Sequence, residues 1–277
     1  MEFNWLESIL YALISGMTEF LPVSSAAHQS ILRTLFGNSG NTIVLDFLIH
    51  LAALAAVYIN CQSHVSAIIR TRRILSIPKR RRKRQPNMTL VAELRLLRSA
   101  ALPAIVMVFF TTSVSVVADK LQLLALILLI NGTMLYITGH IPIGNKTVGS
   151  MNRFESLLIG LASGFGIVPG FSRLGLGVSV AVMRSTTPQN AFNWSLLLSI
   201  PVLGALCIAD IVLMFTAGVG SFGFLTLIQC MVSAFFAYVG ATLAMTLLRF
   251  IAVKAGFSWF SYYCWGLAMF AFLLFMI

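Results

Sequence analysis

Acidic residues are scarce in this chain, and charge of either sign is low. Only 8 of the 277 residues are Asp or Glu, and charged residues make up 10% of the sequence, against about 25% in a soluble globular domain. Apolar residues make up 58%. This composition excludes an ordinary soluble domain and predicts an integral membrane protein.

Cysteine is also rare, and its spacing fits no ligand or redox motif. The four cysteines lie in or beside apolar segments, at Cys61, Cys207, Cys230 and Cys264. The sequence has no P-loop, no HExxH motif and no nucleotide fingerprint. These absences argue against a disulfide framework, a Cys/His metal cluster and the common nucleotide-binding enzymes.

The net charge of +11 is concentrated in one region. Eleven of the 19 Lys and Arg residues lie between Arg70 and Arg98, six of them in succession at 79–84. The region has no interleaved aromatic residues and no recognisable nucleic-acid-binding fold, so we expect no nucleic-acid partner. A cytoplasmic loop that obeys the positive-inside rule accounts for the charge instead. We therefore expect 61–98 to be cytoplasmic.

Six apolar segments are long enough to cross a membrane as helices, which takes about 20 residues. They are 43–60, 99–117, 121–139, 190–215, 224–248 and 257–277. Two further apolar regions are interrupted, 5–36 at Pro22-Val23-Ser24-Ser25 and 154–184 at Pro169-Gly170-Phe171-Ser172. Each indicates a re-entrant helical hairpin, which a membrane tolerates only beside protein or a wet cavity.

The two breaks have the same pattern. Pro22 precedes Ser25 by the same spacing as Pro169 precedes Ser172, and three spans follow each break. An odd number of spans per half puts the halves in opposite orientations. The sequence therefore predicts an all-α integral membrane fold of six transmembrane helices and two re-entrant helical hairpins in an inverted repeat.

We treat 1–277 as a single membrane domain, with 1–139 as the first inverted repeat and 150–277 as the second. If 61–98 is cytoplasmic, this topology places sixteen of the 19 basic residues on the same side. The residues added to that side are Lys146, Arg153, Arg184, Arg249 and Lys254. Both termini are expected on the outer side.

The first break carries unusual chemistry for a membrane segment. Pro22 ends one helix, and Ser24 or Ser25 suits the N-cap of the next, whose free N–H groups then form a site for phosphate or carboxylate. Ser25 and His28 are three residues apart and share a helix face, so a hydroxyl and an imidazole can converge there. Glu19 lies one turn before the break. A kinked helix with capping serines is the competing interpretation.

The second break adds a cation. Gly170 allows close backbone approach, Ser172 can cap a helix, and Arg173 offers a planar fork of donors that suits phosphate. An arginine at a break within the membrane needs an anionic partner or a water cavity. Glu19 and a ligand phosphate are the candidates for that partner.

Three other ionisable residues lie in the spans. Asp46 and His50 are four residues apart on one helix face, where they either line a cavity entrance or form a local hydrogen-bonded pair. Asp210 is either a helix-packing residue or a cavity residue. The sequence leaves these alternatives open.

Two motifs resemble the signatures of a known family. The segments 16–28 (GMTEFLPVSSAAH) and 169–173 (PGFSR) resemble those of the bacterial undecaprenyl pyrophosphate phosphatase family, also called the bacitracin-resistance family. The resemblance covers nearly the whole chain and includes Asn131-Gly132 and 192–201. It implies an enzyme that hydrolyses undecaprenyl pyrophosphate to undecaprenyl phosphate and phosphate, recycling the lipid carrier of peptidoglycan synthesis in the bacterial cytoplasmic membrane.

The resemblance also implies the site. The candidate catalytic residues are Ser25, His28, Glu19 and Arg173. The candidate substrate-binding residues are Ser24, Ser172, Gly170 and Arg173. Ser25 is the expected nucleophile and His28 the general base, with His28 as nucleophile the alternative. A divalent cation, Mg²⁺ or Ca²⁺, is implied as cofactor, with Glu19 as its candidate ligand. The expected partners are a polyprenyl (pyro)phosphate lipid and the membrane, with a homodimer left open.

Three positions depart from the family pattern. Ser15 stands where the family has Glu or Gln, and Leu174 and Gly177 stand where it has hydroxyl side chains. These departures predict a thinner polar shell around the site. They motivate an alternative function, a non-hydrolytic transporter or flippase of polyprenyl phosphate lipids built on the same fold.

Overall fold

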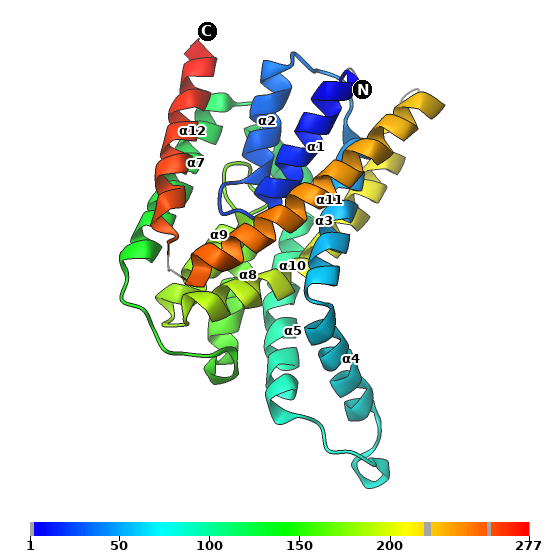
Figure 1. The fold of residues 1–277 in the computed structure, drawn as a ribbon, viewed down its shortest axis with the longest axis vertical. Helices are drawn as coiled ribbons and strands as arrows, with labels where there is room; N and C mark the ends of the chain where they lie inside the picture. The colour runs from blue at the N-terminus through cyan, green and yellow to red at the C-terminus, as the bar shows by residue number, and fades with distance from the viewer. Residues whose placement is uncertain (1–2, 219–222, 254–255, 277) are drawn as a thin grey trace.

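The structure is a computed structural model that describes residues 3–218, 223–253 and 256–276. Its α-helices are, in chain order, α1 (Trp5–Glu19), α2 (Ser25–Leu35), α3 (Ile43–Asn60), α4 (Gln62–Ser76), α5 (Met88–Val108), α6 (Thr111–Val114), α7 (Leu121–His140), α8 (Arg153–Phe165), α9 (Arg173–Met183), α10 (Pro188–Ala217), α11 (Phe224–Val253) and α12 (Ser258–Met276). Short 3₁₀ turns occupy Lys79–Arg81, Ser115–Val117 and Val148–Ser150. The arrangement is shown in Figure 1.

The predicted all-helical, multi-span architecture is confirmed. Within the described residues, α3, α7, α10, α11 and α12 are long and apolar enough to cross a membrane, and α5 with the helical turns after it gives a sixth span bent by 58°. The span predicted at 99–117 corresponds to the bent part of this pair. At the bend the Thr111 hydroxyl donates to the Val108 carbonyl, which competes with the helix ladder.

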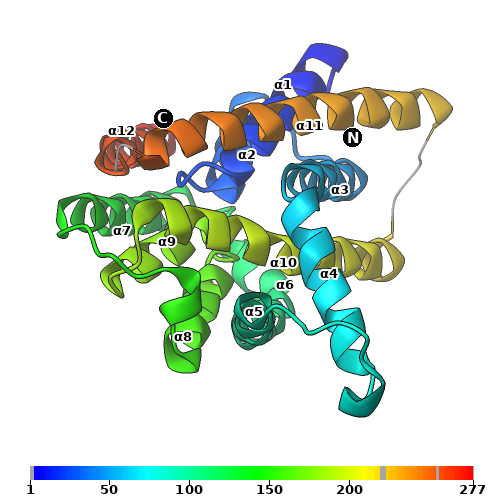
Figure 2. The same cartoon turned by 60° about the horizontal axis from the view of Figure 1, so that its bottom comes forward.

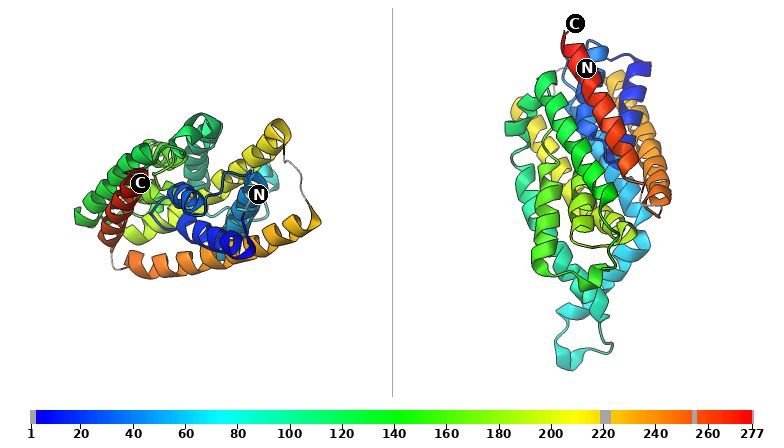
Figure 3. Two further views of the ribbon diagram at one scale, coloured as in Figure 1. Left: turned by 90° about the horizontal axis from the view of Figure 1, so that it is seen from above. Right: turned by 90° about the vertical axis from the view of Figure 1, so that its left-hand side faces the viewer.

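The basic region 61–98, expected as a loop, is mostly helical. α4 runs back against the first turns of α5, and His64 Nε2 lies 2.9 Å from Glu93 Oε2 between them. Figure 2 shows α4 projecting from the bundle, and the 79–84 tip lies at the end opposite the start of α1 and the end of α12 (Figure 3, right). Lys254, predicted on the same side as this tip, lies outside the described residues.

Both interrupted regions form helical hairpins. α1 turns at 20–24 and α2 returns beside it, while α8 turns at 166–172 into α9 (Figure 1). The first hairpin is followed by α3, α5 and α7, and the second by α10, α11 and α12. This is the element order that an inverted repeat of 1–139 and 150–277 requires, and the inverted relation itself stays a prediction.

Glycine lets each hairpin pack closely against a long helix. A Cβ atom at Gly16 of α1 would lie 2.1 Å from the carbonyl oxygen of Ala237 in α11. A Cβ atom at Gly160 of α8 would lie 2.1 Å from the carbonyl oxygen of Ala100 in α5. Small residues at such crossings allow the backbone-to-backbone contact typical of membrane helices.

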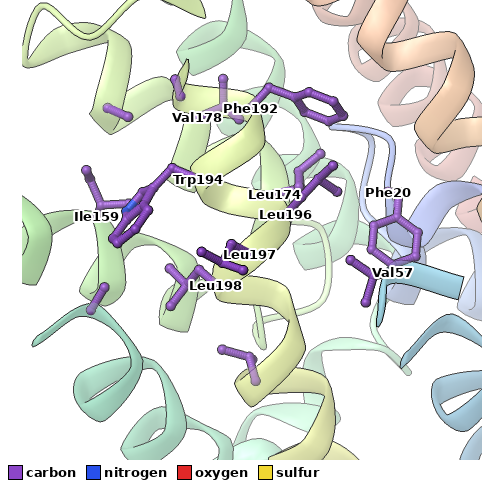
Figure 4. Close-up of a cluster of buried hydrophobic side chains, with 14 of the residues drawn as sticks. Phe20, Val57, Ile159, Leu174, Val178, Phe192, Trp194, Leu196, Leu197 and Leu198 are labelled. Carbon is purple, nitrogen blue, oxygen red and sulfur yellow. The ribbon is translucent and has the colours of Figure 1, made fainter. Parts of the chain in front are cut away.

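The largest apolar core joins the two breaks. Phe20 from the first break and Leu174 from α9 are buried in the same cluster as Phe192, Trp194 and Leu196 of α10 (Figure 4). Because Phe20 and Leu174 belong to one buried cluster, apolar packing helps to hold the first break and α9 in their relative position.

Candidate functional site

The two breaks are held together by hydrogen bonds between side chains and backbone. The N–H of Gly170, which has a φ of 103°, donates to Ser24 Oγ at 3.1 Å. Ser172 Oγ donates to the Leu21 carbonyl at 3.1 Å and accepts the Gly175 N–H at 3.1 Å. Two predicted substrate-binding side chains, Ser24 and Ser172, therefore position backbone at the junction.

A buried amide from α7 joins both breaks. Asn131 Nδ2 donates to the Pro22 carbonyl at 3.1 Å, and Asn131 Oδ1 accepts the Ser172 N–H at 2.9 Å. Sequence reasoning noted this residue only as part of a family-like run. The signal that could have found it is an amide, 1% exposed, in an otherwise apolar span, where a buried polar group needs partners.

Glu19 and Arg173 form an ion pair across the junction. The contact joins Arg173 Nη2 to Glu19 Oε1, and the two side chains are 8% and 9% exposed. Of the two partners considered for Arg173, the structure therefore pairs it with Glu19. Arg173 Nε is buried and has no hydrogen-bond partner among the described residues. One guanidinium donor thus stays available beside the pair.

A cavity of about 690 Å³ opens beside this ion pair. Glu19, Ser25, Ser172 and Arg173 line its inner end. Its lining continues to the loop after α2 and to the segment that follows α5, at the end of the bundle away from the 79–84 tip (Figure 1). The cavity therefore reaches from the breaks to one end of the molecule.

Two helices begin at this cavity. In α2 the Ser24 side chain caps the Ala27 N–H, and in α9 the Ser172 side chain caps the Gly175 N–H. The described hydrogen bonds leave the N–H groups of Ser25 and Ala26, and those of Arg173 and Leu174, without an acceptor. Free N–H groups and the positive ends of two helix dipoles, beside a guanidinium, make an anion site.

Ser25 and His28 do not converge as the sequence predicted. The Ser25 hydroxyl lies on the cavity and donates to the Ser15 carbonyl at 3.3 Å. His28 is not among the residues that line the cavity. Its Nδ1 lies 2.7 Å from the Ser24 carbonyl oxygen, its Nε2 lies 2.7 Å from the Tyr263 hydroxyl, and its ring stacks on that of Tyr263.

Asp46 and His50 each have a partner on another helix, so of the two alternatives the local hydrogen-bonded pair is not formed. Asp46 Oδ2 accepts from Arg33 at 2.6 Å and Asp46 Oδ1 accepts from the Tyr11 hydroxyl at 2.9 Å. His50 Nδ1 lies 2.7 Å from Asp210 Oδ2. Asp46, His50 and Asp210 all line the cavity, as one of the two alternatives proposed.

None of the three departures from the family pattern lines the cavity. Leu174 is 2% exposed and packs in the core, and a Cβ atom at Gly177 would lie 2.5 Å from Ser163 Oγ, away from the cavity lining. Ser15 contacts Ser25 through its carbonyl, and its own hydroxyl is buried without a partner. Of the three positions, Ser15 alone contacts a residue that lines the cavity, Ser25.

The donor set does not fit a resident divalent cation. Among the described residues, no group of three or more His, Cys, Asp or Glu side chains could hold a metal ion. Glu19, the candidate ligand, is already neutralised by Arg173, and position 15 supplies a hydroxyl in place of a second carboxylate. Mg²⁺ and Ca²⁺ favour several charged oxygen ligands, and the residues around Glu19 do not provide them.

Both motifs lie within the match of this chain to a known protein family. The family model described as "Bacitracin resistance protein BacA" matches residues 8–270. The chain belongs to the BacA family. The family resemblance inferred from the motifs is confirmed, and with its apolar helices the chain is a multi-pass membrane protein.

Relatives within the BacA family align over most of their length. The undecaprenyl-diphosphatase of Carboxydothermus hydrogenoformans is 27% identical over 266 residues, 96% of this chain and 95% of that protein. Undecaprenyl-diphosphatase 1 of Shouchella clausii is 29% identical over 271 residues, 97% and 95% of the two chains. The undecaprenyl-diphosphatase of Methanococcus maripaludis is 30% identical over 198 residues, 71% and 75% of the two chains.

Proposed function

We propose that this chain is an undecaprenyl-diphosphatase, which hydrolyses undecaprenyl pyrophosphate to undecaprenyl phosphate and inorganic phosphate and so recycles the lipid carrier. The observation that carries the proposal is the pair of helix N-termini, α2 and α9, that open with Arg173 onto one cavity. A pyrophosphate carries the negative charge that this arrangement attracts. The relatives named undecaprenyl-diphosphatase support the same substrate.

Phosphoryl transfer depends mainly on positioning and on stabilising charge at the transferred phosphate. Arg173 and the free N–H groups at the start of α9 are suited to that charge. Glu19 holds the guanidinium in place and releases part of it when the more highly charged pyrophosphate enters. Ser25 is the nucleophile, since its hydroxyl is at the cavity wall beside the start of α2.

The remaining predicted site residues hold the two breaks and the helix starts in position. Ser24 and Gly170 fasten the first break to the second, and Ser172 caps α9, so these three hold the N–H groups that bind the phosphates. His28 fastens α2 to α12 through Tyr263 and thereby positions Ser25. The sequence suggested His28 as the general base, but His28 does not line the cavity.

The enzyme works in the cytoplasmic membrane, with the cavity open to the outer face and the basic 79–84 tip inside. The positive-inside rule supports this orientation, because the loop after α2, which lines the cavity, and the 79–84 tip lie at opposite ends of the bundle (Figure 1). The prenyl tail lies along the spans.

A homodimer stays a prediction, and chemical crosslinking in native membranes would test it. No observation favours the non-hydrolytic transporter.

The test is phosphate release from undecaprenyl pyrophosphate by the purified full chain. Arg173→Ala and Ser25→Ala should each lower the rate by about 10²-fold or more, since charge stabilisation and the attacking group are lost. Arg95→Ala and Ser76→Ala remove the same chemical groups at exposed positions and serve as matched controls. Wild-type release no faster than that of Arg173→Ala would contradict the proposed function.

A further inference from the structure

A histidine other than His28 lines the cavity, on a helix outside the two family motifs. His50 of α3 and Asp210 of α10 both line the cavity that Glu19, Ser25 and Arg173 line at its inner end. Their side chains are each 17% exposed, and His50 Nδ1 lies 2.7 Å from Asp210 Oδ2. Sequence reasoning had no way to join them, because 160 residues separate the two positions.

The pairing fixes which ring nitrogen is free. A carboxylate only accepts hydrogen bonds, so we assign the proton to Nδ1 of His50. In that tautomer Nε2 carries a lone pair, and no described hydrogen bond engages it. An imidazole held at one nitrogen by a carboxylate and open at the other is the arrangement that general-base catalysis uses.

His28 has neither property. Its Nδ1 donates to the Ser24 carbonyl, and its Nε2 accepts from the Tyr263 hydroxyl. Both nitrogens are therefore occupied, and the ring is outside the cavity lining. Of the two histidines, His50 alone presents a free acceptor nitrogen to the cavity.

Other charged groups around His50 have partners of their own. Asp46 on the same helix accepts from Arg33 and from the Tyr11 hydroxyl. The titratable and charged groups on the elements packed near this part of α3 are Tyr11 and Glu19 (α1), Arg33 (α2), Cys207 and Asp210 (α10), Cys230 (α11) and Arg173 (α9). Of the carboxylates in this set, Asp210 is the one bonded to His50.

We infer that His50 is the general base of the reaction and that Asp210 is its positioning residue, an inference that rests on the proposed function. In the first step the Ser25 oxygen bonds to the terminal phosphorus, and the bond from that phosphorus to the bridging oxygen breaks. The electron pair leaves with undecaprenyl phosphate. The Ser25 proton passes to His50 Nε2, directly or through one cavity water.

The second step restores the enzyme. The proton on Nε2 first leaves to the departing lipid phosphate or to cavity water. A water oxygen then bonds to the phosphorus as the Ser25 oxygen–phosphorus bond breaks, and inorganic phosphate is released. The water gives one proton to His50 Nε2, and His50 Nε2 then passes that proton to the Ser25 oxygen. Substrate plus one water thus yields two phosphates, with no redox change.

The experiment is the pH dependence of phosphate release from undecaprenyl pyrophosphate by the full chain. The rate of wild type should fall as the pH is lowered through the range in which an imidazole titrates, about pH 5 to 8. We call this fall the acid limb of the pH profile. His50→Gln should lower the rate by about 10²- to 10⁴-fold and abolish this acid limb. Asp210→Asn should displace the limb, and Asp210→Glu should restore it. His140→Gln, at an exposed position, should keep both rate and limb.

The variant His28→Gln separates the two histidines, because it should lower the rate only through the position of Ser25 and should keep the acid limb. An acid limb retained in His50→Gln, or lost in His28→Gln alone, would overturn the inference. If His50→Gln does not fold, as judged by size exclusion, the Asp210→Asn and Asp210→Glu profiles decide in its place. A wild type without phosphate release would instead contradict the proposed function.

Discussion

The backbone N–H of Gly170 donates to the side chain of Ser24, 146 residues earlier, at 3.1 Å. One hydroxyl therefore caps the helix of the first break and holds the turn of the second. Ser24 adopts a φ of 67°, a left-handed conformation that is costly for a residue with a Cβ atom. The contacts of its hydroxyl compensate for that conformation.

Removing this hydroxyl should destabilise the protein. Ser24→Ala should lower the free energy of unfolding by about 1 kcal/mol for the lost cap, and by a further ~1–3 kcal/mol for the buried N–H left unpaired. Ser24→Gly should cost less, because glycine relieves the positive φ. Thermal unfolding in detergent measures both, and equal unfolding temperatures for wild type and Ser24→Ala would contradict the assignment.

A carboxylate restored at position 15 should create a cation requirement. In Ser15→Glu the new side chain lies one turn from Glu19, and two carboxylates on one helix face repel unless a cation binds between them. Phosphate release by this variant should depend on Mg²⁺ or Ca²⁺ and stop in EDTA. Wild type and Ser15→Gln should be insensitive to EDTA, and loss of wild-type activity in EDTA would show that a cation does act here.

The close crossing of α1 and α11 should not tolerate a methyl group. Gly16→Ala would push a Cβ atom against the Ala237 carbonyl, with an expected cost of about 1–3 kcal/mol. Gly204 in α10 is the matched control, since a Cβ atom there meets nothing within 4 Å. Gly204→Ala should be neutral or slightly stabilising by thermal unfolding. Equal effects of the two substitutions would mean that the crossing is not tight.

The stability of the α8 start should depend on pH. Glu155 is 2% exposed, lies outside the long spans, and accepts a hydrogen bond from Lys146 Nζ at 2.8 Å. That bond lowers the pKa of Glu155 from its ordinary value. Ionised Glu155 therefore stabilises the fold above the pKa of the unfolded chain, about 4.3, and this contribution is lost as the pH falls through the lower folded pKa.

Glu155→Gln keeps the shape of the side chain and removes the charge. At pH 7 this variant should unfold at a lower temperature than wild type. Between about pH 5 and pH 3 the two curves should converge, because wild type loses the ionic contribution that the variant never had. Parallel curves over that interval would show that the Lys146 contact adds no pH-dependent stability.

The sequence predicted the breaks because their signals are local. Proline, serine and glycine act on their own backbone, so Pro22 and Ser172 mark helix ends whatever surrounds them. The partner of Arg173 could be narrowed to Glu19 or a ligand phosphate, because a buried cation in a membrane needs an anion. The family pattern strengthened these interpretations and agreed with the helix order inferred from the apolar segments and the breaks.

The directions of individual side chains could not be predicted in the same way. A spacing of three puts Ser25 and His28 about 60° apart on a helix, and the cavity edge falls between them. The spacing of Asp46 and His50 allowed a local pair or a cavity entrance, and it did not indicate the partners that both side chains have on other helices. Periodicity identifies a helix face and does not say which neighbour that face meets.

The hydrogen bond from His28 to Tyr263 has a consequence for how the protein is made. Asn131 fastens the two breaks from the middle of the chain, and Tyr263 fastens α2 from its last helix. The N-terminal hairpin is synthesised first but receives its final support only when α12 has entered the membrane. A ribosome must therefore translate α12 before the first half of the site is set, and a chain truncated before α12 would be inserted but inert.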